Sequence, residues 1–351
     1  MVVLAVFPAR KKFLDENWGG RMAIEIMSDG NADLSYVEDL KPMRPEWNHI
    51  RHACGYISPD YLENLLSQIP GFSEYSSTLA SGMFRKRFGT RKIPLIMGII
   101  NVTPDSFYPG SRLENTDIRK IDSIIEEKPD IIDVGGESTR PGSNPVNSEE
   151  EISRILPVVK HISETTSIPI SIDTIKPGVL EKVIDYHVKY ANDISGLGNT
   201  DMAMLAANND LHYVLMHMRG TPQTMQDHTE YNDPVAEVMI FFFEKVRSLM
   251  ECGLKLQNVV IDPGIGFAKG YDTNLEIMRS ASSINMGLEV LFGTSRKSFL
   301  GKILSVTPER RLNGTIASSI YLMNRGVDIL RLHDISSNRE AMLTYTEISE
   351  D

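Results

Sequence analysis

Eight short apolar segments, rich in Ile, Val and Leu, recur from residue 93 to residue 334, and each ends abruptly in polar residues or glycine. They are IPLIMGIINVTPDSF (93–107), DIIDVGGESTRPG (130–142), IPISIDT (168–174), YANDIS (190–195), HYVLMHMRG (212–220), NVVIDPGIGF (258–267), EVLFGTSRKS (289–298) and VDILRLHD (327–334). Their apolar residues are continuous rather than alternating, which is typical of strands covered on both faces of a parallel sheet. The segments therefore predict a series of buried parallel strands.

The stretches between these segments carry helix signals. SEEEISRILPVVKHISE begins at Ser148, which we predict as an N-cap, and its three glutamates suit the positive end of a helix dipole. Gly253 and Gly326 follow two other helical stretches at positions typical of C-terminal glycines. Strands that alternate with helices in this way predict an α/β fold, a (β/α)8 TIM barrel. A doubly wound open sheet is the alternative, which eight successive units disfavour.

Residues 1–88 do not share this repeat, so we expect an N-terminal extension or small module of unknown role, followed by the barrel over residues 89–351. VVLAVF (2–7) has the composition of a strand, and SPDYLENLLSQI (58–69) that of a helix with Ser58 as its N-cap. MRPEWNHIRHACGY (43–56) matches neither pattern.

The composition limits the partners of the chain. With 41% hydrophobic and 24% charged residues it is typical of a soluble globular protein, and its net charge of -11 argues against a broad surface for nucleic acid or anionic membranes. The first apolar run precedes its basic residues, which is the wrong order for a secretory signal, and no stretch reaches about 18 apolar residues. Two distant cysteines fit a reducing compartment. We expect a cytoplasmic protein.

The polar residues that end the eight segments are the candidate site. In a barrel of this kind the carboxyl ends of the strands carry the active site, so these side chains would converge. Taken singly, each carboxylate could equally be a helix cap or a buried hydrogen-bonding group. Taken together they predict one site, and the set is Asn101, Asp133, Thr139, Arg140, Asp173, Asn192, Asp262, Lys297, Arg331 and His333.

One part of this set suits a flat heterocycle. Asp173, Asn192 and Asp262 offer acceptors and an amide, and a carboxylate that accepts two parallel N–H bonds matches an amidine-like edge such as a 2-amino-4-oxo pterin or a guanine. Lys297 can donate to a ring carbonyl, and the planar guanidinium of Arg331 can stack on the ring.

The other part suits an anion. Arg140 and His333 match a phosphate or pyrophosphate, and the side-chain oxygen of Asn101 is a suitable ligand for a bridging Mg²⁺. The sequence has neither the spacing of a zinc site nor a Ser–His–Asp arrangement.

Eight motifs place the chain in a known family. NVTPDSF, DVGGESTRPG, SIDT, NDISG, LMHM, DPGIGF, TSRKSFLG and RLHD occur in the order and approximate spacing of the dihydropteroate synthases, and the chain resembles that family over residues 93–345. The resemblance implies a transferase of folate biosynthesis that condenses 6-hydroxymethyl-7,8-dihydropterin pyrophosphate with p-aminobenzoate or a related arylamine, and releases pyrophosphate. It also implies Mg²⁺ and a homodimer formed through helices late in the chain.

The resemblance assigns roles by motif position. The expected catalytic residues are Asp173, Asp262, Lys297 and Arg140. The pterin pocket would also hold Asn192, Met216 and Arg331; the pyrophosphate and Mg²⁺ would contact Asn101, Arg140 and His333; and the arylamine side would be Thr139, Pro141, Phe107, Phe267 and Ser298. We expect a dissociative reaction, in which Arg140, His333 and Mg²⁺ stabilise the leaving group while the two aspartates stabilise the pterin cation.

The chain departs from the family pattern in two loops. Residues 108–111 read Tyr-Pro-Gly-Ser where the family has Ser-Asp-Gly-Gly, and residues 268–270 read Ala-Lys-Gly where Gly-Lys-Thr is familiar. These changes leave room for a different arylamine or a modified pterin. Two other functions stay open, a methyltransferase that uses a methylated reduced pterin and a non-catalytic pterin-binding protein. The methyltransferase would have no use for Arg140, Lys297 and His333 as a basic set.

Overall fold

The computed structural model describes residues 2–7, 22–28, 51–57, 93–102, 115–138, 143, 145–284 and 288–349. The helix predicted from Ser58 lies outside these residues. In the described part of the chain no helix is both long enough and apolar enough to cross a lipid bilayer.

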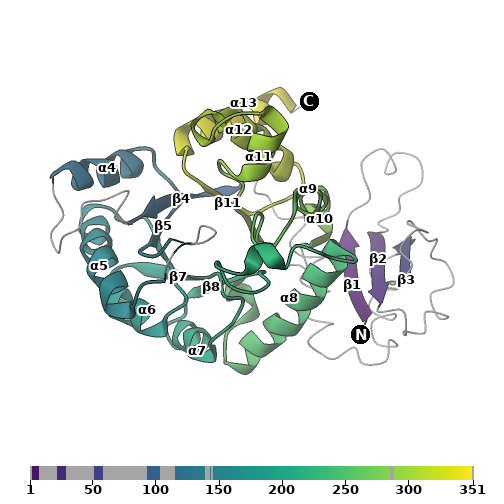
Figure 1. Ribbon diagram of the computed structural model, residues 1–351, viewed down its shortest axis with the longest axis horizontal. Helices are drawn as coiled ribbons and strands as arrows, with labels where there is room; N and C mark the ends of the chain where they lie inside the picture. Colours follow the sequence, from purple (N-terminus) through teal and green to yellow (C-terminus); the bar gives the residue numbers. More distant parts are fainter. Residues whose placement is uncertain are drawn as a thin grey trace.

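Eight parallel strands of the described chain close into a barrel, in which each strand pairs with the next along the chain and the last pairs with the first (Figure 1). The strands are β4 (Leu95–Asn101), β5 (Ile131–Gly135), β6 (Ile170–Asp173), β7 (Val188–Asp193), β8 (His212–Met216), β9 (Val259–Asp262), β10 (Glu289–Phe292) and β11 (Ile329–Leu332). The predicted (β/α)8 barrel is therefore confirmed, and each strand lies within or beside one of the eight apolar segments.

Helices follow the strands and form the outer layer of the barrel (Figure 1). They are α4 (Asn115–Glu126), α5 (Ser148–Thr165), α6 (Pro177–Val183), α7 (Thr200–Asn208), α8 (Pro234–Glu251), α9 (Tyr271–Arg279), α10 (Ala281–Ile284), α11 (Ser298–Leu304), α12 (Leu312–Met323) and α13 (Ile335–Ser349).

Two helix ends test the sequence signals. The N-cap of α5 is Asn147, whose Oδ1 accepts a hydrogen bond from the backbone N–H of Glu150 at 2.8 Å. The prediction of Ser148 as the cap was wrong by one residue, because Asn and Ser cap equally well and the chain places them side by side. Gly253 and Gly326 do lie just beyond α8 and α12, with φ angles of 91° and 72° that favour glycine.

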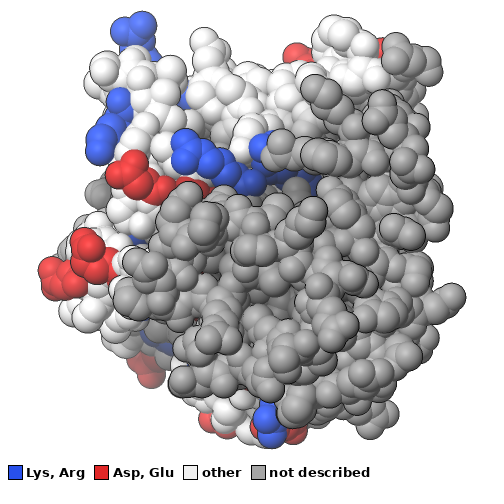
Figure 2. All heavy atoms as spheres, turned by 90° about the vertical axis from the view of Figure 1, so that its right-hand side faces the viewer, with Lys and Arg blue, Asp and Glu red and all other residues white. Residues whose placement is uncertain are grey.

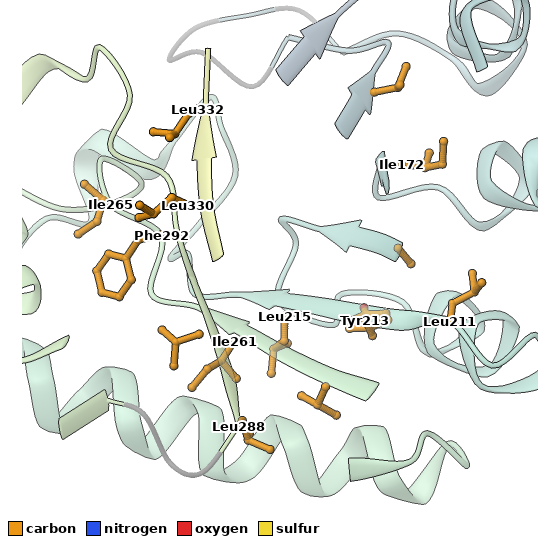
Figure 3. Close-up of a cluster of buried hydrophobic side chains, with 14 of the residues drawn as sticks. Ile172, Leu211, Tyr213, Leu215, Ile261, Ile265, Leu288, Phe292, Leu330 and Leu332 are labelled. Atoms are coloured by element: carbon orange, nitrogen blue, oxygen red, sulfur yellow. The ribbon is translucent and has the colours of Figure 1, made fainter. Parts of the chain in front are cut away.

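Side chains alternate between two hydrophobic cores. Inside the barrel Met97, Ile131, Tyr190, Val214, Val260, Leu291 and Ile329 form one buried cluster. On the outside, the intervening strand residues pack beneath the helices; Figure 3 shows Leu215, Ile261 and Leu330 among them. Both faces of each strand are buried, which explains why the sequence shows continuous apolar runs.

The inward-facing positions change from apolar to polar toward the carboxyl ends of the strands. A polar residue stands two positions after a residue of the inner cluster in four strands, where it points to the same side of the sheet. The pairs are Ile131 and Asp133, Tyr190 and Asn192, Val260 and Asp262, and Ile329 and Arg331. The alternation of the strands thus places these four polar side chains over the inner core, at one end of the barrel.

A small antiparallel sheet precedes the barrel. Its strands are β1 (Val2–Phe7), β2 (Met22–Ser28) and β3 (Arg51–Ile57), in that order, and β1 lies beside α8 and α10 (Figure 1). The predicted strand at residues 2–7 is confirmed. The interpretation of residues 43–56 as matching no element was wrong for 51–56. These residues form β3 by pairing with β2, but Arg, His and Gly interrupt the apolar pattern by which a strand is recognised in a sequence. On this side of the molecule the described surface carries basic and acidic groups alike (Figure 2).

Candidate active site

The structure gathers most of the predicted residues at the carboxyl end of the barrel. The last residues of their strands are Asn101, Asp173, Met216 and Asp262, while Asn192 and Arg331 lie one position earlier and His333 directly follows β11. Phe267 lies in the loop after β9, and Lys297 and Ser298 lie at the start of α11. The other predicted residues, Phe107, Thr139, Arg140 and Pro141, lie outside the described residues.

Arg331 joins two carboxylates across the barrel. Its Nε donates to Asp133 Oδ2 at 2.6 Å, and its Nη2 donates to Asp173 Oδ2 at 2.7 Å. Both carboxylates are buried, and such charge-assisted bonds fix the plane of a guanidinium. Arg331 is therefore held in one orientation, as a residue that recognises a flat ligand must be.

Asp133 is the centre of this network, although the sequence analysis gave it no role. It is 0% exposed and accepts hydrogen bonds from Ser171 Oγ at 2.5 Å and from Asn192 Nδ2 at 3.2 and 3.3 Å. Asp133 thus orients Asn192 as well as Arg331. The strand-end pattern placed Asp133 in the candidate set, and its spacing, two residues after Ile131 on the inward face of β5, is the signal for its contact with the other inward-facing polar groups.

Burial shifts the pKa of Asp173. Removal from water raises its pKa from 3.8 to about 7, because burial disfavours the charged form; the positive charge of Arg331 opposes this shift, and the negative charge of Asp133 adds to it. Burial lowers the pKa of Arg331, but Asp133 and Asp173 outweigh that effect, so the pKa of Arg331 is raised and the guanidinium stays charged. The pair therefore provides a fixed cation beside a carboxyl group that can titrate.

Asp262 lies in a tight turn after β9. Its Oδ1 accepts a hydrogen bond from the backbone N–H of Gly264 at 2.7 Å. Burial raises the pKa of Asp262, and the positive charge of Lys297 is the largest effect that opposes it. Gly264 has a φ of +67°, and a Cβ there would collide with the backbone oxygen of His217. Only glycine fits at this position without displacement of the turn that holds Asp262.

Lys297 lies against the same turn. Its Nζ donates to the backbone oxygen of Ile265 and lies 4.8 Å from the centre of the Phe267 ring. Burial lowers the pKa of Lys297 from 10.5 to about 8; Asp262 opposes this shift, and Arg331 adds to it. Lys297 is thus a partly buried ammonium donor with a lowered pKa.

The buried side chain of Lys269 also holds this turn through hydrogen bonds to the backbone. Lys269 Nζ donates to the backbone oxygen of Phe267 at 2.9 Å and to that of His217 at 3.2 Å, and it lies 2.9 Å from His217 Nδ1. Lys269 is 4% exposed, and burial lowers its pKa well below the ordinary value. Burial and the charge of Lys269 lower the pKa of His217 to about 2, so that imidazole is neutral. This role of Lys269 has no signal in the sequence.

His333 and Lys297 belong to two loops that the ion pair between Arg296 and Asp334 joins. Arg296 donates to both carboxylate oxygens of Asp334, at 2.9 and 2.5 Å. Each of these residues directly adjoins a predicted site residue, Lys297 or His333. His333 Nδ1 also lies 3.1 Å from Ser295 Oγ, and this contact orients the exposed imidazole. The pair thus holds the loop that contains Lys297 against the loop that contains His333.

The described residues offer few oxygen ligands for a metal ion. The described residues contain no cluster of three or more His, Cys, Asp or Glu side chains that could hold an ion by themselves. Asn101 offers one amide oxygen at the rim of the barrel. Mg²⁺ is commonly held by one or two protein oxygens together with phosphates and water, and the amide oxygen of Asn101 is a ligand of that kind.

Comparison with known proteins agrees with this geometry. Residues 97–333 match the family model described as pterin binding enzyme. The dihydropteroate synthase of Clostridium beijerinckii is 40% identical over 261 residues, which cover 73% of this chain and 94% of that protein. The crystal structure of Xanthomonas albilineans dihydropteroate synthase with 4-aminobenzoic acid superposes with a TM-score of 0.69 at 33% identity, covering 74% of this chain and 94% of that one.

A further solved structure, Thermus thermophilus dihydropteroate synthase in complex with 6HMPPP, matches with a TM-score of 0.64 at 33% identity and covers 74% of this chain and 95% of that one. The matched region is the barrel, and it spans nearly the full length of these relatives. The chain belongs to the pterin-binding enzymes and, among them, to the dihydropteroate synthases, which are transferases.

Proposed function

We propose that the barrel condenses 6-hydroxymethyl-7,8-dihydropterin pyrophosphate with p-aminobenzoate or a related arylamine, giving a dihydropteroate and pyrophosphate. The observation that carries this proposal is the convergence of two buried carboxyl groups, Asp173 and Asp262, with two partly buried cations, Lys297 and Arg331, at one end of the barrel. The relatives crystallised with 4-aminobenzoic acid and with 6HMPPP support the choice of substrates.

The pterin would be recognised by groups that are already oriented. Asp262 keeps one oxygen free of the Gly264 hydrogen bond, and that oxygen can accept N–H groups from the 2-amino-4-oxo edge. Lys297 can donate to the ring carbonyl. Because Asp133 holds both Arg331 and Asn192, these two side chains meet the ring without losing further conformational freedom.

The carbon–oxygen bond to the diphosphate would break with positive charge left on the pterin. Asp173 and Asp262 would stabilise that charge, which is a form of electrostatic preorganisation. Arg140 and His333 would stabilise the negative charge on the diphosphate. Asn101 would provide an oxygen ligand to Mg²⁺, which when bound to the diphosphate neutralises part of the leaving group's charge.

The arylamine would approach from the side of Phe267 and Ser298. Phe267 lies beside Lys297, and Ser298 is exposed at the N-terminus of α11, so a carboxylate on the amine could accept hydrogen bonds there. Thr139, Pro141 and Phe107 are proposed to complete this side. An arylamine is a weak base that attacks largely unprotonated, so the chain need not provide a strong general base.

The test is incubation with the pterin pyrophosphate, Mg²⁺ and p-aminobenzoate, with pyrophosphate release as the readout. Release that requires the amine is expected for the synthase. Binding of the pterin without turnover would instead indicate a non-catalytic pterin-binding protein. The electrostatic role is tested by Asp262→Asn in a single-turnover experiment. The proposal expects a slower chemical step at saturating substrate, and a variant that loses only affinity would show that Asp262 serves recognition alone.

We also propose that the protein is a cytoplasmic homodimer that pairs through α11 and α13. Large hydrophobic side chains are exposed on both helices: Ile303 (50%) and Leu304 (42%) on α11, and Leu343 (47%) and Ile348 (78%) on α13. Light scattering after gel filtration should give a dimer mass that Leu343→Glu lowers. Met204→Glu is the matched control, since Met204 is 42% exposed on the distant helix α7. A monomer for the wild-type chain would refute the dimer.

A further inference from the structure

A cavity of about 330 Å³ lies among the loops that follow β5, β6, β7 and β8. Glu137 and Glu151 line it from the β5 side, Asp173 and Ile175 from β6, Ile194 from β7 and Met218 from β8. Among the described residues, Asp173 is the one that this cavity shares with the predicted catalytic and substrate-binding set. The cavity therefore adjoins the proposed pterin pocket at Asp173.

The acidic side of the cavity contains Glu151, one of whose carboxylate oxygens accepts no hydrogen bond from the described residues. Glu151, in the first turn of α5, is 0% exposed, and its Oε2 accepts a hydrogen bond from Lys176 Nζ at 2.5 Å. Its other oxygen, Oε1, is also buried and accepts no hydrogen bond from any residue that the structure describes. A buried carboxylate oxygen without a donor is unfavourable, so a ligand that brings an N–H group would be stabilised there.

The charges around the cavity exclude anions. Lys176 Nζ donates to Glu137 as well as to Glu151, so one ammonium group serves two carboxylates. Asp173 is a third acidic group on the wall. Because Asp173 is already paired with Arg331, Glu137 and Glu151 against Lys176 leave one net negative charge, which favours a cationic group.

The opposite side of the cavity is apolar. Ile194 is buried, and Ile175 is 40% exposed at the rim, where Met218 also lies. Apolar walls with a few convergent polar groups are typical of small-molecule sites. The occupant that matches both sides has an apolar body and carries N–H donors at one end.

We propose that this cavity binds the ammonium or amidinium end of a small, largely apolar molecule, with Glu151 as the principal acceptor. Two sources share this chemistry, a free amine or amidine and a basic substituent on the pterin substrate. The subsite itself does not depend on the condensation reaction. Its link to the pterin pocket through Asp173 does rest on the proposed function.

The test uses benzamidine as the probe and isothermal titration calorimetry on the full chain. We expect saturable binding at one site, at least tenfold weaker in Glu151→Gln because a charge-assisted hydrogen bond is lost. Glu149→Gln is the matched control, since Glu149 is exposed in the same turn of α5 and should leave the affinity unchanged. Thermal melts would show that each variant is folded.

Two more variants test the charge balance in opposite directions. Ile175→Arg puts a cation at the exposed rim, within reach of the carboxylates, and should abolish binding of the probe. Lys176→Gln removes the cation that neutralises Glu137 and Glu151, and should strengthen binding. If Lys176→Gln weakened binding as much as Glu151→Gln, a general loosening of the loops would explain both variants and the proposal would be wrong.

Competition with pterin pyrophosphate and with p-aminobenzoate shows where benzamidine binds. It also shows whether the natural ligand is a free amine or amidine or a basic substituent on the pterin. Retention of benzamidine binding with saturating pterin pyrophosphate, in the absence of arylamine, supports a site for a free amine. Mutual exclusion that still depends on Glu151 supports a substituent on the pterin. Displacement by p-aminobenzoate, indifference to Glu151→Gln, or no binding to the wild-type chain overturns the subsite. Amine-dependent pyrophosphate release, measured on the same preparation, tests the proposed function separately.

Discussion

Arg331 Nε and Asp133 Oδ2 lie 2.6 Å apart in the centre of the barrel, and this ion pair connects a predicted substrate-binding residue to a carboxylate with no predicted role. Asp133 is fully buried and also accepts hydrogen bonds from Asn192 and Ser171. It acts through the residues that it orients, so we class it as a positioning residue.

Asp133→Asn should therefore impair the site without touching the substrate. Its neutral amide leaves part of the charge of Arg331 uncompensated, and we expect a loss of about 2 kcal/mol in the free energy of unfolding. The value of kcat/KM for the pterin substrate should fall at least about tenfold, which is about 1.4 kcal/mol of transition-state stabilisation. Urea denaturation and steady-state kinetics measure the two effects.

The control for this substitution is Asp122→Asn. Asp122 pairs with His161 on the surface, where its side chain is 41% exposed, and its change should alter stability by less than about 0.5 kcal/mol. Equal effects of the two substitutions on stability and on kcat/KM would show that Asp133 does not position Arg331 and Asn192.

The pH dependence of catalysis should report two groups whose pKa values are shifted, Asp173 and Lys297. The site needs Asp173 ionised and Lys297 protonated, and burial brings their pKa values to about 7 and about 8. We therefore expect a narrow bell-shaped profile of kcat/KM, falling on the acid side with Asp173 and on the alkaline side with Lys297. Lys297→Arg should remove the alkaline limb, because its guanidinium does not titrate in this range. An alkaline limb that persisted in this variant would have to be assigned to another group.

Folding stability should depend on pH with a definite sign. The pKa of Asp173 is higher in the folded chain, about 7, than the ordinary value of 3.8, so the folded state binds the proton more tightly. Its contribution is fully present below about pH 4 and is lost as the pH rises through 7. The stability of Asp173→Asn relative to the wild-type chain should therefore increase over this range, as followed by urea denaturation at a series of pH values. A constant difference would mean that Arg331 keeps Asp173 ionised throughout.

The turn after β9 provides a sharp stability test. Gly264→Ala should cost more than about 2 kcal/mol, because it combines a positive φ with a collision against the backbone of His217. Gly178→Ala is the matched control: Gly178 is exposed in α6, nothing lies within 4 Å of a Cβ there, and we expect a gain of about 0.5–1 kcal/mol. Chemical denaturation measures both. Similar changes in the free energy of unfolding at the two positions would show that the turn can accommodate a Cβ atom.

The barrel could be predicted because its strands are covered on both faces. That burial produces long apolar runs whose number and order are visible in the sequence, and the turn residues after each run mark the carboxyl end. β3 was missed because its stretch RHACGYI has mixed polarity, and the backbone pairing with β2 that defines it as a strand leaves no apolar run in the sequence.

The network within the site could be predicted only in part. The residue types at the strand ends identify Asp173, Asp262 and Arg331, but the sequence does not say which groups meet. That Arg331 pairs with Asp133 depends on the closure of the barrel, which brings β11 and β5 to either side of β4. The burial of Glu151 was missed because three consecutive glutamates at a helix start look like a solvated first turn, and the face that is buried depends on packing against β5.

Lys269 is expected to support the site through the backbone. Lys269→Met would leave the backbone oxygens of His217 and Phe267 without this donor in a buried place, and we expect a loss of about 3 kcal/mol in the free energy of unfolding. Lys182→Met, at an exposed position in the last turn of α6, should cost less than about 0.5 kcal/mol.

A second readout separates a specific contact from general damage. The charge of Lys269 adds to the effect of burial in lowering the pKa of His217 to about 2. Removal of this charge should raise the pKa of His217, while burial should keep it below the ordinary value of 6.5. Titration of the His217 ring followed by NMR measures this shift. If His217 stayed neutral to the same low pH in Lys269→Met, burial alone would account for its state, and the electrostatic contact between the two side chains would be refuted.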